Sequence, residues 1–224
     1  MVMTDTFATL RDRLVALVER DVCESSTFLG KNRLDPRVIA ALRETPRHEF
    51  VPDGAMRAHA YENRPLPIGH GQTISQPFIV AIMTDMLDLT PDSRVLEIGT
   101  GCGYQAAILS QLAGLVYSVE IVEALADSAQ ARLRRLGYRN IQVIHGDGRA
   151  GWLAEAPYDA IIATAAAREV PDALRDQLKP GGRLVIPLGA PNMPQSLVRL
   201  DKDAAGNWRE HCHLPVAFVP MTAL

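Results

Sequence analysis

The spacing of apolar positions changes along this chain, and it predicts which elements form. Near the start, Phe7, Leu10, Leu14, Leu17 and Val18 recur at helical intervals, which predicts an amphipathic helix. A helix of this kind buries its apolar face and leaves the opposite face in solvent. We therefore expect the first segment to be a helix with one buried face.

Two more helices are expected before residue 90, separated by a loop. Residues 37–43 form the first, because Asp35 can cap it, Pro36 suits its first turn and Pro46 ends it. The stretch 66–77 is too rich in Gly and Pro for a regular element, which indicates a loop that can carry functional residues. The next helix has apolar side chains at helical spacing: Phe78, Ile79, Ile82, Met83, Met86 and Leu87.

From residue 94 onward, short apolar runs alternate with helical stretches. The predicted strands are 95–98, 116–120, 141–145, 159–164 and 183–188, and the predicted helices are 106–112, 123–136 and 171–178, with a turn at 179–182. This alternation predicts a doubly wound α/β fold, with a parallel sheet and helices on both of its faces. Two further strands, 196–200 and 216–219, flank the turn residues 203–207 and predict an antiparallel hairpin at the sheet edge.

Three alternating glycines follow the first predicted strand. Gly99, Gly101 and Gly103 permit a sharp turn and a close approach of ligand to backbone. The dinucleotide fingerprint requires a further glycine where this chain has Tyr104, which speaks against a bound pyrophosphate. Glu120 ends the next strand, where a carboxylate accepts hydrogen bonds from ribose hydroxyls. The pattern predicts a nucleoside ligand without a diphosphate, and S-adenosylmethionine is the candidate.

Composition narrows the possible partners and the compartment. The 224 residues are 47% hydrophobic and 22% charged, enough for one globular unit with a full core. A net charge of −3 provides no basic field for nucleic acid. Cys23, Cys102 and Cys212 form no C-x-x-C pair, which favours a reducing cytoplasm. Residues 1–5 lack a basic leader region, and no apolar run approaches the roughly 18 residues of a spanning helix, so no export or membrane contact is expected.

Several segments together resemble the protein-L-isoaspartate O-methyltransferase family. The matching segments, in order from about Pro46 onward, are 69–77, the glycine loop with Glu97, 118–120, 145–148, 156–161, 178–184 and 218–222. Many methyltransferases share the glycine loop and the Pro-Gly-Gly turn, whereas the segment G-Q-T-I-S-Q-P at 71–77 is distinctive of this family. The chain departs from the family pattern at Cys102, where serine is usual, and in the stretch 190–208.

The resemblance implies methyl transfer from S-adenosylmethionine to the α-carboxylate of L-isoaspartyl residues in damaged proteins. The ester then collapses to a succinimide, which reopens partly to aspartate. A carboxylate is ionised at neutral pH, so the reaction needs no strong general base. Alignment of the reacting groups can supply roughly 7–11 kcal/mol of the acceleration.

Ser75 is the residue that the resemblance assigns to the substrate carboxylate. From position alone, a helix N-cap ahead of Gln76 and Pro77 is the favoured role, and the resemblance reverses that order. A nucleophilic role is not expected, because Ser75 lacks the G-x-S-x-G elbow and carboxylate methylation needs no covalent intermediate.

The resemblance also implies a set of cofactor contacts. They are Thr73, Ile74, Ser75, Glu97, Gly99, Gly101, Cys102, Glu120, Asp147, Gly148 and Thr222. Ordinary roles compete at some positions: Asp147 can be a turn residue, and Thr222 an unspecialised residue near the chain end. His211 and His213 share a strand face and could bind a metal, but solvated histidines are expected, since no third ligand lies near in sequence.

We divide the chain into a helical extension with the substrate and cofactor loop, 1–90, and a methyltransferase core, 91–224. No metal is expected. Two alternatives stay open. The chain could methylate an aspartate of a dedicated biosynthetic peptide, although it carries no appended recognition domain. It could also bind the nucleoside without catalysis, which the intact loop around Ser75 argues against.

Overall fold

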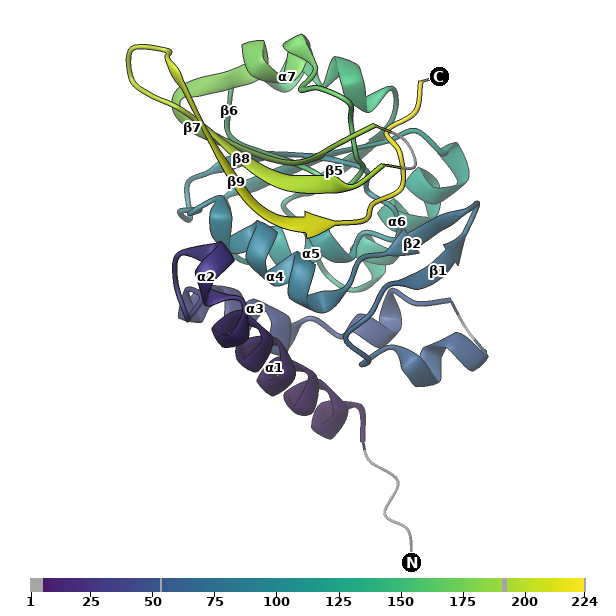
Figure 1. Ribbon diagram of the computed structural model, residues 1–224. Helices are drawn as coiled ribbons and strands as arrows, with labels where there is room; N and C mark the ends of the chain where they lie inside the picture. Colours follow the sequence, from purple (N-terminus) through teal and green to yellow (C-terminus); the bar gives the residue numbers. More distant parts are fainter. Residues whose placement is uncertain (1–5, 53, 191–192, 224) are drawn as a thin grey trace, which may run out of the picture.

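A seven-stranded sheet lies at the centre of the computed structural model, which describes residues 6–52, 54–190 and 193–223 (Figure 1). Residues 1–5 and the side chains of Cys212 and His213 lie outside the described part. From edge to edge, the strands are β5 (Ile141–His145), β4 (Leu115–Glu120), β3 (Arg94–Ile98), β6 (Tyr158–Ala163), β7 (Leu178–Leu188), β8 (Gln195–Lys202) and β9 (Trp208–Val216). The first five are parallel, and β8 and β9 continue the sheet antiparallel. The predicted sheet is confirmed.

Helices cover both faces of the sheet, so the central strands are buried on both sides (Figure 1). In β3, Val95 belongs to one cluster of buried side chains and Leu96 to the other, as alternation along a strand requires. The first cluster includes residues of α4 (Pro77–Met86), α5 (Tyr104–Leu109) and α6 (Glu123–Arg135); the second includes α7 (Asp172–Gln177). The short helices η3 (Gly148–Ala150) and η4 (Leu153–Glu155) connect β5 to β6.

The amino-terminal helices add a further layer outside α4. They are α1 (Phe7–Glu24), α2 (Ser26–Leu29) and α3 (Pro36–Glu44), followed by η1 (Arg47–Glu49) and η2 (Ala55–His59). Helix α1 buries Leu14, Val15, Val18 and Val22 and packs against α3 and α4, as its amphipathic pattern predicts. Asp35 caps α3 by accepting from the backbone N–H of Arg37 at 2.8 Å. Both predicted helices are confirmed.

The prediction that 66–77 lacks regular structure is wrong, because it contains an antiparallel hairpin. Strands β1 (Leu66–Gly69) and β2 (Gln72–Ile74) pair across a turn in which His70 and Gly71 have φ of 54° and 71°. A two-residue turn with positive φ matches the twist of such a ribbon. Pro67 is tolerated because a two-stranded ribbon has only edge strands. The residues that suggested a loop are those that a tight hairpin requires.

The carboxyl-terminal strands also differ from the prediction. Strand β7 begins at Leu178 and continues through the predicted turn 179–182, where its register against β6 shifts. Strand β9 is Trp208–Val216, so the predicted strand 216–219 is wrong apart from its first residue. Asp203 accepts from the N–H groups of Ala205 and Asn207, which closes a tight turn and starts pairing at Trp208. Apolar residues alternate at Trp208, Cys212, Leu214 and Val216, but Glu210 interrupts them, so the first half of β9 has only a weak apolar signal in the sequence.

The cap of α4 comes from outside the helix. The N-cap position is Gln76, and it makes no side-chain capping bond, so the alternative reading of Ser75 as the N-cap is wrong. Asn63 caps the helix instead: its Oδ1 accepts from the N–H of Phe78 at 3.0 Å, and its Nδ2 donates to Asp21 of α1 at 2.7 Å. One amide thus joins α1 to the start of α4.

Removing this cap should destabilise the fold. We expect Asn63→Ala to lower the free energy of unfolding by about 0.5–2 kcal/mol, the usual cost of a lost helix cap. Urea denaturation measures the change. Asn32→Ala is the matched control, because Asn32 is exposed. Equal stabilities of the two variants would contradict the capping role.

Candidate active site

The glycine loop follows β3 and lies against the end of β6. Gly99, Gly101 and Gly103 have φ of 93°, 55° and 87°, a region that side chains rarely permit. A Cβ at Gly99 would lie 2.5 Å from Oγ1 of Thr164, the residue after β6. That hydroxyl donates to the carbonyl oxygen of Gly99 at 2.6 Å. The loop therefore requires glycine at its first position.

Glu120 holds the other side of this loop. It ends β4 with only 4% of its surface exposed. Its Oε2 accepts from the N–H of Gly101 at 2.7 Å, and its Oε1 accepts from the N–H of Val122 at 3.0 Å. These two bonds fix the carboxylate, and each oxygen keeps a second lone pair for a further donor.

A cavity, here called the loop cavity, lies above the carboxyl ends of β3, β4 and β6. Its lining comes from the hairpin, the strand ends and the chain end: Gln72, Thr73, Ile98, Gly99, Gly101, Val119, Glu120, Ile121, Gly148, Thr164, Ala165, Val219, Pro220, Met221 and Thr222. Six residues predicted to contact a cofactor are among these: Thr73, Gly99, Gly101, Glu120, Gly148 and Thr222. One carboxylate among apolar walls suits a nucleoside with its ribose at Glu120.

Ser75 lines a second cavity, here called the Ser75 cavity. It is bounded by Pro65, Thr73, Ser75, Gln76, Ile79, Thr164 and residues 215–219. Thr73, Thr164 and Val219 line both cavities, so the two are adjacent. Ser75 is half-buried and has no hydrogen-bond partner among the described residues. Its hydroxyl is thus available to a ligand beside the loop cavity.

Four predicted contact residues line neither cavity. Ile74 and Cys102 belong to the buried cluster on the α4 side of the sheet. Asp147 caps η3 by accepting from Arg149 N at 2.9 Å and pairs with its guanidinium at 2.6 Å. Gly148, the next residue, does line the loop cavity, and a Cβ on Gly148 would clash with Cγ2 of Ile98.

Glu97, the fourth of them, is fully buried behind the glycine loop. Its Oε2 accepts from the hydroxyl of Ser118, which also hydrogen-bonds Thr100 Oγ1 at 2.5 Å. Burial raises the pKa of Glu97 to about 8, against the opposing effect of the Ser118 hydrogen bond. The side chain is therefore mostly protonated at neutral pH, and it supports the loop through Ser118 and Thr100.

The segment 217–222, here called the C-terminal segment, closes both cavities. Ala166 N donates to Val219 O, and Met221 N donates to Ala166 O, both at 2.8 Å. The side-chain amide of Gln195 makes two hydrogen bonds with the backbone of Phe218: it accepts from the N–H at 2.7 Å and donates to the carbonyl oxygen at 3.1 Å. Gln195 and Thr164 were not predicted from the sequence as site residues. Thr164 could have been found from its place after a parallel strand, but Gln195 acts on a residue 23 positions away and gives no local signal.

The histidines of β9 do not show a metal site. His211 Nε2 lies 3.3 Å from Asp201 Oδ2, and the side chain of His213 is outside the described residues. Within the described ranges, no group of three or more metal-binding side chains occurs. The described helices also include none that is long and apolar enough to cross a membrane.

Comparisons with known proteins agree on one family. The family model described as protein-L-isoaspartate(D-aspartate) O-methyltransferase matches residues 27–224. Protein-L-isoaspartate O-methyltransferase 2 of Syntrophobacter fumaroxidans is 55% identical, over 97% of this chain and 88% of its own length. The enzyme of that name from Polaromonas sp. is 53% identical, over 95% of this chain and 99% of its own length.

Solved structures share the fold. A protein-L-isoaspartate O-methyltransferase superposes with a TM-score of 0.80 at 29% identity, over 95% of this chain and 66% of its own. A Plasmodium falciparum structure in complex with S-adenosyl-L-homocysteine has a TM-score of 0.76 at 22% identity, over 98% of this chain and 99% of its own. The family model and the relatives identify the chain. It belongs to the protein-L-isoaspartate(D-aspartate) O-methyltransferase family.

Proposed function

We propose that this chain transfers a methyl group from S-adenosylmethionine to the α-carboxylate of L-isoaspartyl residues in damaged proteins and peptides, the first step of their repair. The observation that carries the proposal is the meeting of the two cavities at Thr73, Thr164 and Val219. One cavity has the carboxylate and apolar walls that suit a nucleoside. The other presents the free hydroxyl of Ser75. A methyl donor and an acceptor in these cavities would be neighbours.

The residues of the loop cavity fit the cofactor. Glu120 accepts ribose hydroxyls with the lone pairs that Gly101 and Val122 leave free. Gly99 and Gly148 let the backbone that lines this cavity pack closely against Thr164 and Ile98. The bound cofactor supplies an electrophilic methyl group. Thr73 and Thr222 line the same cavity and contact the cofactor, whereas Glu97, Ile74 and Cys102 act by holding the backbone that surrounds it.

Ser75 binds the acceptor carboxylate. An α-carboxyl group has a reference pKa of about 3.5 and is ionised at neutral pH, so the site needs no base. The Ser75 hydroxyl donates a hydrogen bond that orients one carboxylate oxygen. Val219 and Thr164 border both cavities and keep water from the reacting atoms. Catalysis here is mainly alignment.

We also propose how the chain is organised, which partners it has and where it acts. Residues 1–90 supply the substrate loop on a helical extension, and 91–224 form the core. The substrates are isoaspartyl proteins and peptides, without nucleic acid, membrane or metal as partners. The cysteine pattern, with Cys23 and Cys102 as free thiols, supports a cytoplasmic protein.

The cofactor role of Glu120 can be tested by its affinity for S-adenosylhomocysteine. We expect Glu120→Ala to raise the Kd about 10- to 150-fold, because a lost charge-assisted hydrogen bond costs about 1.5–3 kcal/mol. Calorimetry measures it. Glu123→Ala, three residues on and exposed, removes the same charge outside the cavity and should leave the Kd unaltered. An unaltered Kd for Glu120→Ala would remove Glu120 from the ribose site.

Substrate selectivity tests the reaction itself. An isoaspartyl residue presents its carboxylate at a position that aspartate does not, because its chain continues through the side chain. A site with a fixed donor should therefore methylate an isoaspartyl peptide and leave the matched aspartyl peptide nearly inert. Labelled S-adenosylmethionine gives both rates. Equal rates would refute repair specificity.

Ser75→Ala should lower kcat tenfold or more, about 1.4 kcal/mol in the barrier, while the thermal midpoint and the cofactor Kd stay close to wild type. The helix following Ser75 keeps its cap from Asn63, so little stability should be lost. Asn63→Ala is the complementary variant, expected to lose stability and to keep its turnover per folded molecule. Normal turnover by Ser75→Ala would contradict the proposal that Ser75 binds the acceptor carboxylate.

A further inference from the structure

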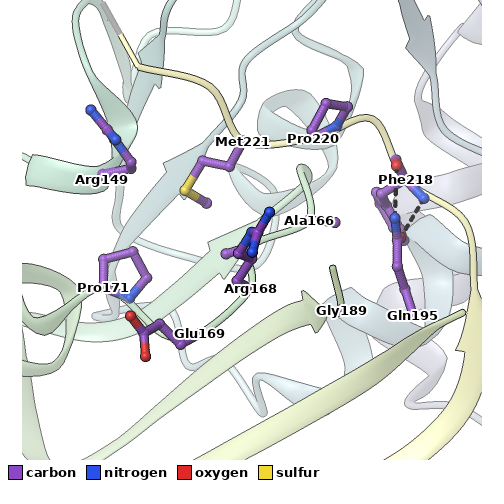
Figure 2. A pocket seen from close by; sticks show the side chains of 11 residues that line it. Arg149, Ala166, Arg168, Glu169, Pro171, Gly189, Gln195, Phe218, Pro220 and Met221 are labelled. Carbon is purple, nitrogen blue, oxygen red and sulfur yellow. Dashed lines mark hydrogen bonds between the residues drawn. The ribbon is translucent and has the colours of Figure 1, made fainter. Parts of the chain in front are cut away.

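A third cavity opens on the far side of the C-terminal segment, and none of the proposed roles uses it (Figure 2). Here called the outer cavity, it is bounded by Phe218, Pro220 and Met221 on one side and by Ala166 and Pro171, after β6, on the other. Figure 2 shows Arg168 in the middle of this space, between the two walls.

The outer cavity borders both cavities of the proposed active site. Phe218 lines both it and the Ser75 cavity, while Pro220 and Met221 line both it and the loop cavity. The wall between them is held in place, because Gln195 bonds both backbone groups of Phe218 and Met221 N donates to Ala166 O. A peptide chain that runs over Phe218 from the Ser75 cavity would therefore lie along the outer cavity.

The charges of the outer cavity favour an anion. Three charged side chains line it, Arg149, Arg168 and Glu169. Arg149 is already paired with Asp147. Arg168 is exposed and forms no ion pair or hydrogen bond with any described residue. The Glu169 carboxylate points away from Arg168, past Pro171 (Figure 2). Arg168 therefore offers a cation that no carboxylate of the described residues neutralises, beside apolar walls.

We propose that the outer cavity binds the substrate chain beside its isoaspartyl residue, and that Arg168 pairs there with an acidic side chain of the substrate. The inference rests on the proposed function. An isoaspartyl residue has peptide chain on both sides, so the chain must leave the Ser75 cavity, and the outer cavity is the neighbouring space across Phe218. Arg168 is thus a specificity residue that makes no contact with the reacting atoms.

The test uses isoaspartyl peptides that differ at one position only. Glu, Gln or Lys is placed one, two or three residues to either side of the isoaspartyl residue, and kcat/KM is measured with the full chain at low salt. At one of these positions we expect Glu to exceed Lys by about fivefold through KM, the size of a favourable exposed ion pair. The preference should shrink as salt screens the pair.

Charge reversal then assigns the effect to its residue. Arg168→Glu should invert the preference, and Arg168→Gln should abolish it. Arg139→Glu makes the same charge change at an exposed site before β5, at the opposite end of the sheet, and should keep the wild-type preference. Methylation without charge preference, or a preference that survives Arg168→Glu, overturns the inference alone. Failure to methylate any isoaspartyl peptide overturns it together with the proposed function.

Discussion

The placement of β3 between β4 and β6 is the constraint on which the site depends. The chain moves outward from β3 to β4 and β5, then returns to the other side of β3 to form β6 and β7. Loops that leave β3 and β6 therefore diverge, and a crevice opens at the carboxyl ends of the strands. The Thr164 hydroxyl bonds Gly99 across this crevice at 2.6 Å. That contact leaves no room for a Cβ at Gly99, and both Gly99 and Thr164 line the loop cavity.

Two segments that lie far apart in the sequence line this crevice and bound the two neighbouring cavities. The hairpin β1–β2 carries Thr73 and leads to Ser75, and the antiparallel strand β9 delivers the C-terminal segment. Neither segment is held by the parallel sheet itself. Asn63 anchors the helix after the hairpin, and Gln195 anchors Phe218. Two side-chain amides thus help to hold these segments, by bonding backbone 15 and 23 residues away in sequence, together with the backbone bonds of Ala166 to Val219 and Met221.

The sequence was sufficient for the elements whose burial follows a regular period. Buried parallel strands such as β3 are mostly apolar, and α1 repeats its apolar face, so both were predicted. The hairpin was missed because Pro67 and Gly71 suit a tight ribbon as well as they suit a loop. The hairpin of β8 and β9 was predicted, but its second strand was placed at 216–219 instead of 208–216, because polar residues such as Glu210 interrupt the apolar alternation. Contacts between remote residues, such as Gln195 with Phe218, leave no trace in local spacing.

The two carboxylates near the glycine loop illustrate how environment divides the work between similar residues. Glu97 has no exposed surface, and its buried position raises its pKa to about 8, so its neutral form can remain in the core beside Ser118. Glu120 lines the cavity and accepts from two backbone N–H groups, which stabilise a carboxylate and fix its direction. The sequence alone predicted the same role for both residues, contact with the cofactor. Their surroundings separate them: Glu97 supports the loop from behind, and Glu120 lines the loop cavity.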